Sequence, residues 1–215
     1  MEVQQPEIRR SHTTANTLYR YVIDHDMGFS PNPFHGCCTL ANCKPVIRRC
    51  AKIGDFVLGF GSAKSNIRGK LIYWLQVEEI LTYDEYWADA RFFIKRSVVN
   101  GSHIKFHGDN IYHRDLHGNF IQEPSFHSLP DGSTNYINLN TDTGSTDRML
   151  ISKTFGYYGK DAISVPEGLV DIVAIGRGHR TFLNGEVKSR AIEWLLNDTS
   201  RGFLGEPSGW SEIKA

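Results

Sequence analysis

Two apolar stretches, FVLGFG at residues 56–61 and LIYWLQV at residues 71–77, dominate the pattern of the sequence. The first follows a Gly54-Asp55 turn, carries two glycines of its own and is too short for a helix, so it predicts a buried strand. The second is a further strand candidate. Because only the polar segment 62–70 separates them, we expect the two strands to pair antiparallel.

Further elements are predicted on both sides of this pair. Strands are expected at 18–23, 148–152 and 169–175, and the last is apolar enough to be buried. Proline and glycine make 24–33 a loop, while Pro45 can begin a short helix. Asp84 can cap another helix that Asp89 closes, and 187–197 has helical spacing after a possible cap at Asn184. Residues 1–17 form a polar lead-in, and we predict one domain over 18–215.

Composition excludes several classes of protein. The chain has 215 residues, 40% of them hydrophobic, which is typical of a folded globular domain and not of a disordered or fibrous protein. Lys and Arg number 24, as do Asp and Glu, so the formal net charge is zero. Proteins that hold duplex DNA by its phosphates usually carry a basic surplus. A nucleic-acid role would therefore need a local patch or a pocket for one base or nucleotide. No long apolar run is present, and we expect a cytoplasmic protein without a membrane segment.

The four cysteines, Cys37, Cys38, Cys43 and Cys50, lie in one stretch. They contain no C-x-x-C pair, and adjacent Cys37 and Cys38 would point to opposite sides of a strand. A structural metal is the alternative, with His35 nearby, but we expect free thiols that pack as small apolar side chains. We predict no metal and no cofactor.

The glycine-rich middle, residues 98–145, holds five of the nine histidines and is expected to be loops and short strands that carry function. His127 stands out because Ser125 and His127 would share one side of an extended chain, which suits a general base. The alternative is a histidine that bonds a loop carbonyl. Asp109 and Asp142 are the carboxylates that we predict to act with His127.

Basic and aromatic residues suggest a nucleotide site elsewhere. Lys44, Arg48 and Arg49 form the most basic cluster, and with Arg20 they would contact a phosphate. A dense group of aromatic residues, Tyr86 and Trp87 among them, would stack on a base, although most aromatic residues in such a chain belong to the core. The predicted nucleotide-binding residues are Arg20, Asn32, Lys44, Arg48, Arg49, Tyr86 and Trp87.

Several motifs resemble a known family. They are YRYV at 19–22, GFSPNPF at 28–34, CKP at 43–45, Gly54-Asp55 and LIS at 150–152. Together they are similar to the second of the nucleotide modification associated domain families, over most of the chain from about Tyr19 to Pro166. Families of that name are grouped with phage and bacterial systems that hypermodify DNA bases. The resemblance implies a role in DNA modification or anti-phage defence, and it implies no particular reaction.

A weaker resemblance is to the EVE and PUA-like readers of modified bases. It rests on the Gly54-Asp55 turn, the strand at 71–77 and the aromatic segment 83–87. It implies an α+β fold in which a small, strongly bent, mostly antiparallel β-barrel or sheet carries flanking helices. Fold analogy does not decide function.

Two functional hypotheses follow. In the first, the chain is a nucleotide- or modified-base-interacting domain that stacks a base and contacts its phosphate without turnover. In the second, it is an enzyme that acts on a nucleotide or modified base with His127, Asp109 and Asp142 as acid-base groups. A structural or interaction subunit is a third reading, for which no nucleotide should raise thermal stability. In the first two, the partner is a nucleotide or modified nucleic acid.

Overall fold

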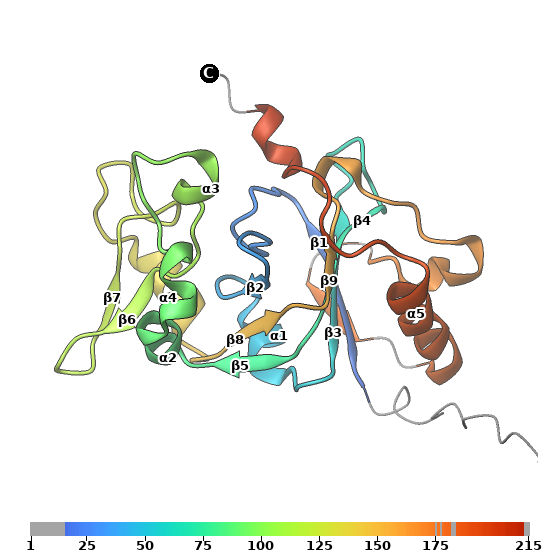
Figure 1. Ribbon diagram of the computed structural model, residues 1–215, viewed down its shortest axis with the longest axis horizontal. Coiled ribbons are helices and arrows are strands. Elements are labelled where there is room, and N and C mark those ends of the chain that lie inside the picture. Colours follow the sequence, from blue (N-terminus) through green and yellow to red (C-terminus); the bar gives the residue numbers. More distant parts are fainter. Residues whose placement is uncertain (1–15, 175, 177, 182–183, 213–215) are drawn as a thin grey trace, which may run out of the picture.

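The structure is a computed structural model that describes residues 16–174, 176, 178–181 and 184–212. The largest sheet has the strand order β10-β1-β3-β4-β9-β11 (Figure 1). As predicted, β3 pairs antiparallel with β4, and β1 lies parallel to β3 on the other side. The bounds are β1 Leu18–Ile23, β3 Phe56–Gly61, β4 Leu71–Gln76, β9 Phe155–Tyr157, β10 His179–Thr181 and β11 Gly202–Phe203.

Both faces of this sheet are covered. Alternate residues of β3 point to opposite sides, so Phe56 and Leu58 join one apolar cluster while Val57 joins another. The first cluster includes Ile192 on α5 (Gly185–Asn197), which lies along one side of the sheet in Figure 1. The Asn184 side chain caps α5, as predicted. The continuous apolar run at 56–61 is thus that of a strand buried on both faces.

The other face packs on a three-stranded sheet with the order β2-β8-β5 and on the short helix α1. Beyond it lies a lobe with its own apolar cluster (Figure 1). The small sheet and its helix are β2 Cys38–Leu40, β8 Met149–Ser152, β5 Glu79–Leu81 and α1 Pro45–Cys50. The lobe contains α2 Tyr83–Ala88, η1 Ala90–Lys95, α3 His103–Phe106, β6 Tyr112–Arg114, β7 Phe120–Gln122 and α4 Tyr136–Thr143. The remaining short helices are η2 Gly159–Asp161, η3 Glu167–Ile172 and η4 Ser208–Glu212.

Three sequence predictions differ from the structure. The strand predicted at 169–175 is wrong, because η3 occupies its first part and places Leu169 and Ile172, three residues apart, in the cluster shared with α5. Thr82, not Asp84, caps α2 through a capping box with Glu85. Helix α4 was missed in the glycine-rich middle, where tertiary packing outweighs weak helical propensity.

The α+β class is confirmed. Within residues 16–174, 176, 178–181 and 184–212 the sheets are open, so the barrel alternative is not what the fold adopts. The similarity to EVE and PUA-like folds stays a prediction, as does the single domain. The polar lead-in falls largely outside the described residues. Of the helices described, none has the length and apolar character needed to cross a membrane.

Candidate functional site

Three side chains from separate segments converge beside α1. Cys43 lies in the turn between β2 and α1, His127 in the loop after β7, and Asp142 on α4. Cys43 Sγ is 3.9 Å from His127 Nε2, and His127 Nδ1 is 3.0 Å from Asp142 Oδ2. A thiol, an imidazole and a carboxylate thus stand in the order that activates a cysteine nucleophile. Catalytic hydrogen bonds are often this long before substrate binds.

Asp142 is held by donors on both carboxylate oxygens. Oδ1 accepts a hydrogen bond from the backbone N–H of Cys43 at 2.6 Å. Oδ2 accepts a hydrogen bond from Tyr112 Oη at 3.0 Å and is also the oxygen that contacts His127. Burial raises the pKa of Tyr112, so its hydroxyl stays protonated and can donate. The Asp142 side chain is 1% exposed. It therefore fixes both the cysteine backbone and the orientation of the imidazole.

His127 is protonated at neutral pH. Burial by itself lowers its pKa, but the hydrogen bonds to Asp142 and Cys43 outweigh burial and raise the pKa to about 9. The ring is packed against Phe29, with 4.4 Å between ring centroids, and its side chain is only 13% exposed. A cationic imidazole next to a sulfur stabilises a thiolate. The imidazole of His127 therefore lies where its Nε2 can exchange a proton with the Cys43 sulfur.

The turn that carries the thiol has a strained backbone. Cys43 has φ 56° and Lys44 has φ 41°, two consecutive non-glycine residues in the left-handed region. Pro45 begins α1, and a proline disfavours the right-handed helical conformation for the residue before it. Strain of this kind costs about 1–3 kcal/mol per residue and persists where the surroundings enforce it, often at functional sites.

Arg48 enforces this turn. The residue is fully buried, and its guanidinium donates to the carbonyl oxygens of Cys43 at 2.8 Å, Asp142 at 2.6 Å and Arg148 at 2.7 Å. It also donates to Tyr83 Oη at 3.0 Å. The sequence predicted Arg48 as a phosphate contact. The structure instead places it as a positioning residue that joins the cysteine turn to the end of α4.

Asp109 lies in a second buried polar network and does not contact His127. Its carboxylate accepts from Thr39 Oγ1 and, at 2.8 Å, from Tyr86 Oη. Burial raises the pKa of Asp109, although Lys95 acts in the opposite direction. Lys95 Nζ donates to Asn32 Oδ1 at 2.7 Å, so the predicted residue Asn32 belongs to this network too. The network supports the loops beneath the cysteine turn.

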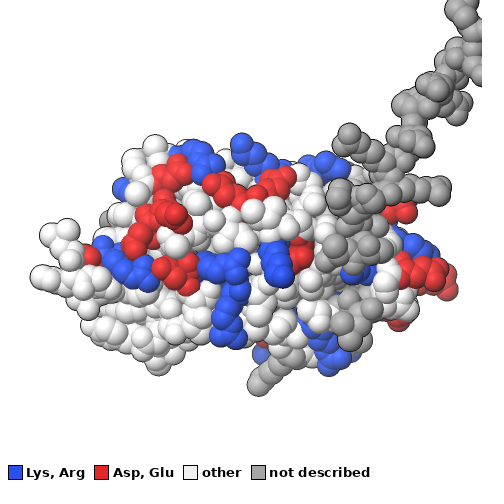
Figure 2. Space-filling view, turned by 90° about the horizontal axis from the view of Figure 1, so that it is seen from below, with Lys and Arg blue, Asp and Glu red and all other residues white. Residues whose placement is uncertain are grey.

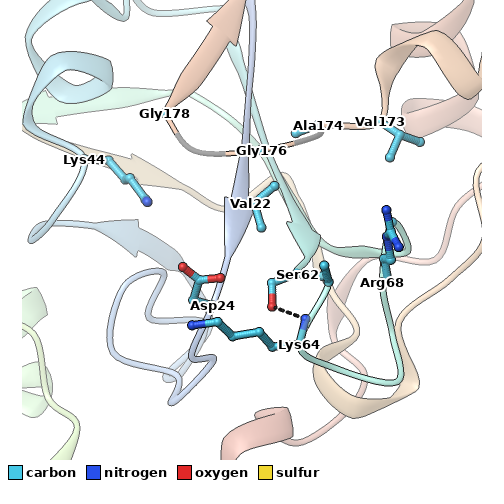
Figure 3. A pocket seen from close by; sticks show the side chains of 13 residues that line it. Val22, Asp24, Lys44, Ser62, Lys64, Arg68, Val173, Ala174, Gly176 and Gly178 are labelled. Atoms are coloured by element: carbon cyan, nitrogen blue, oxygen red, sulfur yellow. Dashed lines mark hydrogen bonds between the residues drawn. The ribbon is translucent and has the colours of Figure 1, made fainter.

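Of the other predicted nucleotide-binding residues, Lys44 lines a cavity with a volume of about 500 Å³ (Figure 3). Tyr86 is fully buried, and the Trp87 ring already stacks on His113 with 4.2 Å between centroids. Arg49 is exposed on α1. Arg20 donates to the carbonyl oxygens of Asp171 and Val173.

Cys43 is the member of this cluster that sequence reasoning missed. All four cysteines are free thiols, and Cys37 and Cys38 are buried as predicted. The described part of the chain contains no group of three His, Cys, Asp or Glu side chains arranged to hold a metal. The sequence did contain one signal. A cysteine is a candidate nucleophile when His and Asp candidates occur elsewhere in the sequence.

Comparison with known proteins gives one match. A family model described as nucleotide modification associated domain 2 matches residues 15–214. No curated protein and no solved structure matches the chain. The match covers nearly the whole chain, including Cys43, His127 and Asp142. The chain therefore belongs to the nucleotide modification associated domain 2 family.

Proposed function

We propose that the chain is an enzyme that acts on a nucleotide or modified base, with Cys43 as nucleophile, His127 as general acid and base, and Asp142 as the group that orients the imidazole. The observation that carries this proposal is the convergence of these three side chains from separate segments. The strained turn at Cys43 and the buried Arg48 beneath it support the same conclusion.

The chemistry that suits this arrangement is acyl transfer. The Cys43 thiolate adds to a carbonyl carbon of a substituent on the nucleotide, a C–S bond forms, and the π electrons move to the carbonyl oxygen. When the oxygen electrons return, the bond to the leaving amine or alkoxide breaks, and that group takes the Nε2 proton of His127. Water, deprotonated by His127, then hydrolyses the thioester. The acid leaves, and the thiolate–imidazolium pair is restored.

The family description supports nucleotides and modified bases as the substrate class. We place the reaction in a DNA base modification or phage-conflict pathway. Base stacking stays part of the proposal, and Phe126 is a further candidate for it because, unlike Tyr86, it is exposed. Phe126 is 38% exposed, and its ring centroid lies 6.2 Å from that of His127. Binding without turnover is the rival reading.

Thiol reactivity tests the nucleophile directly. Cys50 is exposed whereas Cys43 is only partly exposed, so accessibility alone would make Cys50 react faster with iodoacetamide. At about pH 6, we expect Cys43 to react at least about tenfold faster than Cys50, as measured by mass spectrometry of the two peptides. His127→Gln should remove the difference. Equal or slower reaction of Cys43 in the unaltered protein would refute the thiolate–imidazolium pair.

Turnover is tested by chromatography of modified nucleotides that carry an amide or ester, after incubation with the protein. A new product peak that Cys43→Ser abolishes and Cys50→Ser preserves supports the enzyme. A ligand that stabilises the protein and is recovered unchanged from every incubation supports the binding domain.

A further inference from the structure

We propose that the cavity beside Lys44 binds the phosphate of a free nucleotide. This inference rests on the proposed function, because it specifies that the substrate of the enzyme carries a phosphate group. The cavity lies between the end of β1, the 62–70 loop and the segment before β10 (Figure 3). Its volume of about 500 Å³ is within the range of small-molecule sites. It is lined by Val22, Asp24, Lys44, Gly61, Ser62, Ala63, Lys64, Arg68, Gly69, Val173, Ala174, Gly176 and Gly178.

The charge around this cavity is positive although the whole chain is neutral. Three cationic residues line it, Lys44, Lys64 and Arg68, against the single carboxylate of Asp24. Among the residues that the structure describes, neither the Lys64 nor the Arg68 side chain has an ion-pair partner within 4.0 Å. Some other surface cations do have one, such as Arg91 with Glu79. Unneutralised cations that converge on one cavity attract an anion.

Lys44 connects the cavity to the thiol. Its Nζ lies 4.5 Å from the centroid of the Tyr21 ring, and burial lowers its pKa while Cys43 and Asp24 oppose this effect. Lys44 also follows Cys43 directly in the chain, so their Cα atoms are about 3.8 Å apart. A phosphate held by Lys44 would keep the rest of a nucleotide close to the nucleophile.

The cavity wall also leaves room for a ligand. Gly176 and Gly178 both have positive φ, and a Cβ added to either would meet nothing within 4 Å. Glycine at such positions lets a ligand approach the backbone closely. Ser62, almost fully buried, adds a hydroxyl at the cavity.

The observations favour a free nucleotide over a nucleic acid. Binding to duplex phosphates needs basic residues along an extended surface. Figure 2 instead shows, on the face it presents, Lys and Arg interspersed with Asp and Glu. The positive charge of the site is instead local, because Lys44, Lys64 and Arg68 line one cavity.

Binding is tested by isothermal titration calorimetry of the full chain with inorganic phosphate, the four deoxynucleoside monophosphates, the matching nucleosides and a short single-stranded oligonucleotide. We expect the monophosphates to bind and the nucleosides to bind at least about tenfold more weakly. Lys64→Gln and Arg68→Gln should each weaken monophosphate binding by about tenfold. Lys70→Gln is the matched control, because Lys70 is an exposed cation of the same loop that does not line the cavity.

Cys43→Ser separates this inference from the proposed function. Monophosphate affinity within about twofold of the unaltered protein supports a site that does not need the thiol. The phosphate site is refuted if no monophosphate binds, or if the variants Lys64→Gln, Arg68→Gln and Lys70→Gln all bind the monophosphates with the same affinity. This holds even where Cys43 is reactive. If the monophosphates bind but Cys43 is unreactive and no substrate is turned over, the enzyme is refuted and the phosphate site stands. Tighter binding of the oligonucleotide would refute the choice of a free nucleotide.

Discussion

Replacing Arg48 by methionine tests the assignment of this residue as a buried positioning group. The guanidinium is fully buried and donates to three backbone carbonyls, those of Cys43, Asp142 and Arg148. Methionine is unbranched and apolar, so Arg48→Met removes every donor while keeping part of the packing of the side chain. The three carbonyl oxygens are then left buried without this partner.

The expected loss of stability follows from these contacts. The Asp142 carbonyl still faces Tyr83 Oη at 3.3 Å, so two acceptors are left unpaired, at a cost of about 1–3 kcal/mol each or about 2–6 kcal/mol together. Part of this cost is offset, because the variant no longer buries a charge. We therefore expect the free energy of unfolding to fall by about 2–5 kcal/mol. A single domain has about 5–15 kcal/mol in total, so the variant is expected to be folded but marginal.

Urea unfolding followed by circular dichroism measures this loss, and Arg49→Met is the matched control. Arg49 is the next residue on α1 but is exposed, so its replacement should change the free energy of unfolding by no more than about 0.5 kcal/mol. Arg48→Lys keeps the charge but loses the fork of donors, and it should also slow alkylation of Cys43. If Arg48→Met costs less than about 1 kcal/mol, or no more than Arg49→Met, the positioning role is refuted.

Two further predictions concern the imidazole and the end of β3. Asp142→Asn should lower the pKa of His127 from about 9, because burial, which disfavours the cationic ring, remains while the carboxylate that stabilises it is lost; an NMR titration that still gives about 9 would contradict this. Gly61→Ala should cost about 1–3 kcal/mol in urea unfolding, because the new Cβ would lie 2.1 Å from the carbonyl oxygen of Ile67. Gly185→Ala is the control, because a Cβ at this position, at the start of α5, meets open space. If Gly185→Ala lowers the free energy of unfolding as much as Gly61→Ala does, the steric explanation is refuted.

The described structure also shows where local patterns mislead. The stretch at 169–175 has strand-like composition, yet η3 covers its first part because Leu169 and Ile172 pack toward α5. Asp84 has the chemistry of a helix cap, yet it pairs with Arg114 at 2.7 Å and leaves the cap to Thr82. In each case a contact distant in the sequence competes with the local preference and prevails.

The features that could be predicted from the sequence are those that depend on residues close together in the chain. Alternation and apolar runs identify β1, β3 and β4, helical spacing identifies α5, and Pro45 identifies the start of α1, because these periodicities are properties of a few consecutive residues. Residue chemistry likewise marked His127 and Asp142 as acid-base candidates. The family match also follows from sequence alone.

The packing of distant segments, in contrast, brings some of these candidates together and separates others. Cys43 and His127 are 84 residues apart, and the packing of the lobe on the small sheet brings them to 3.9 Å, which no local pattern encodes. The same packing gives three basic residues of one short segment three different environments: Lys44 at a cavity, Arg48 fully buried and Arg49 exposed. The physical reason is that burial and charge pairing depend on the neighbours that a residue acquires when distant segments pack together, and not on its neighbours along the chain.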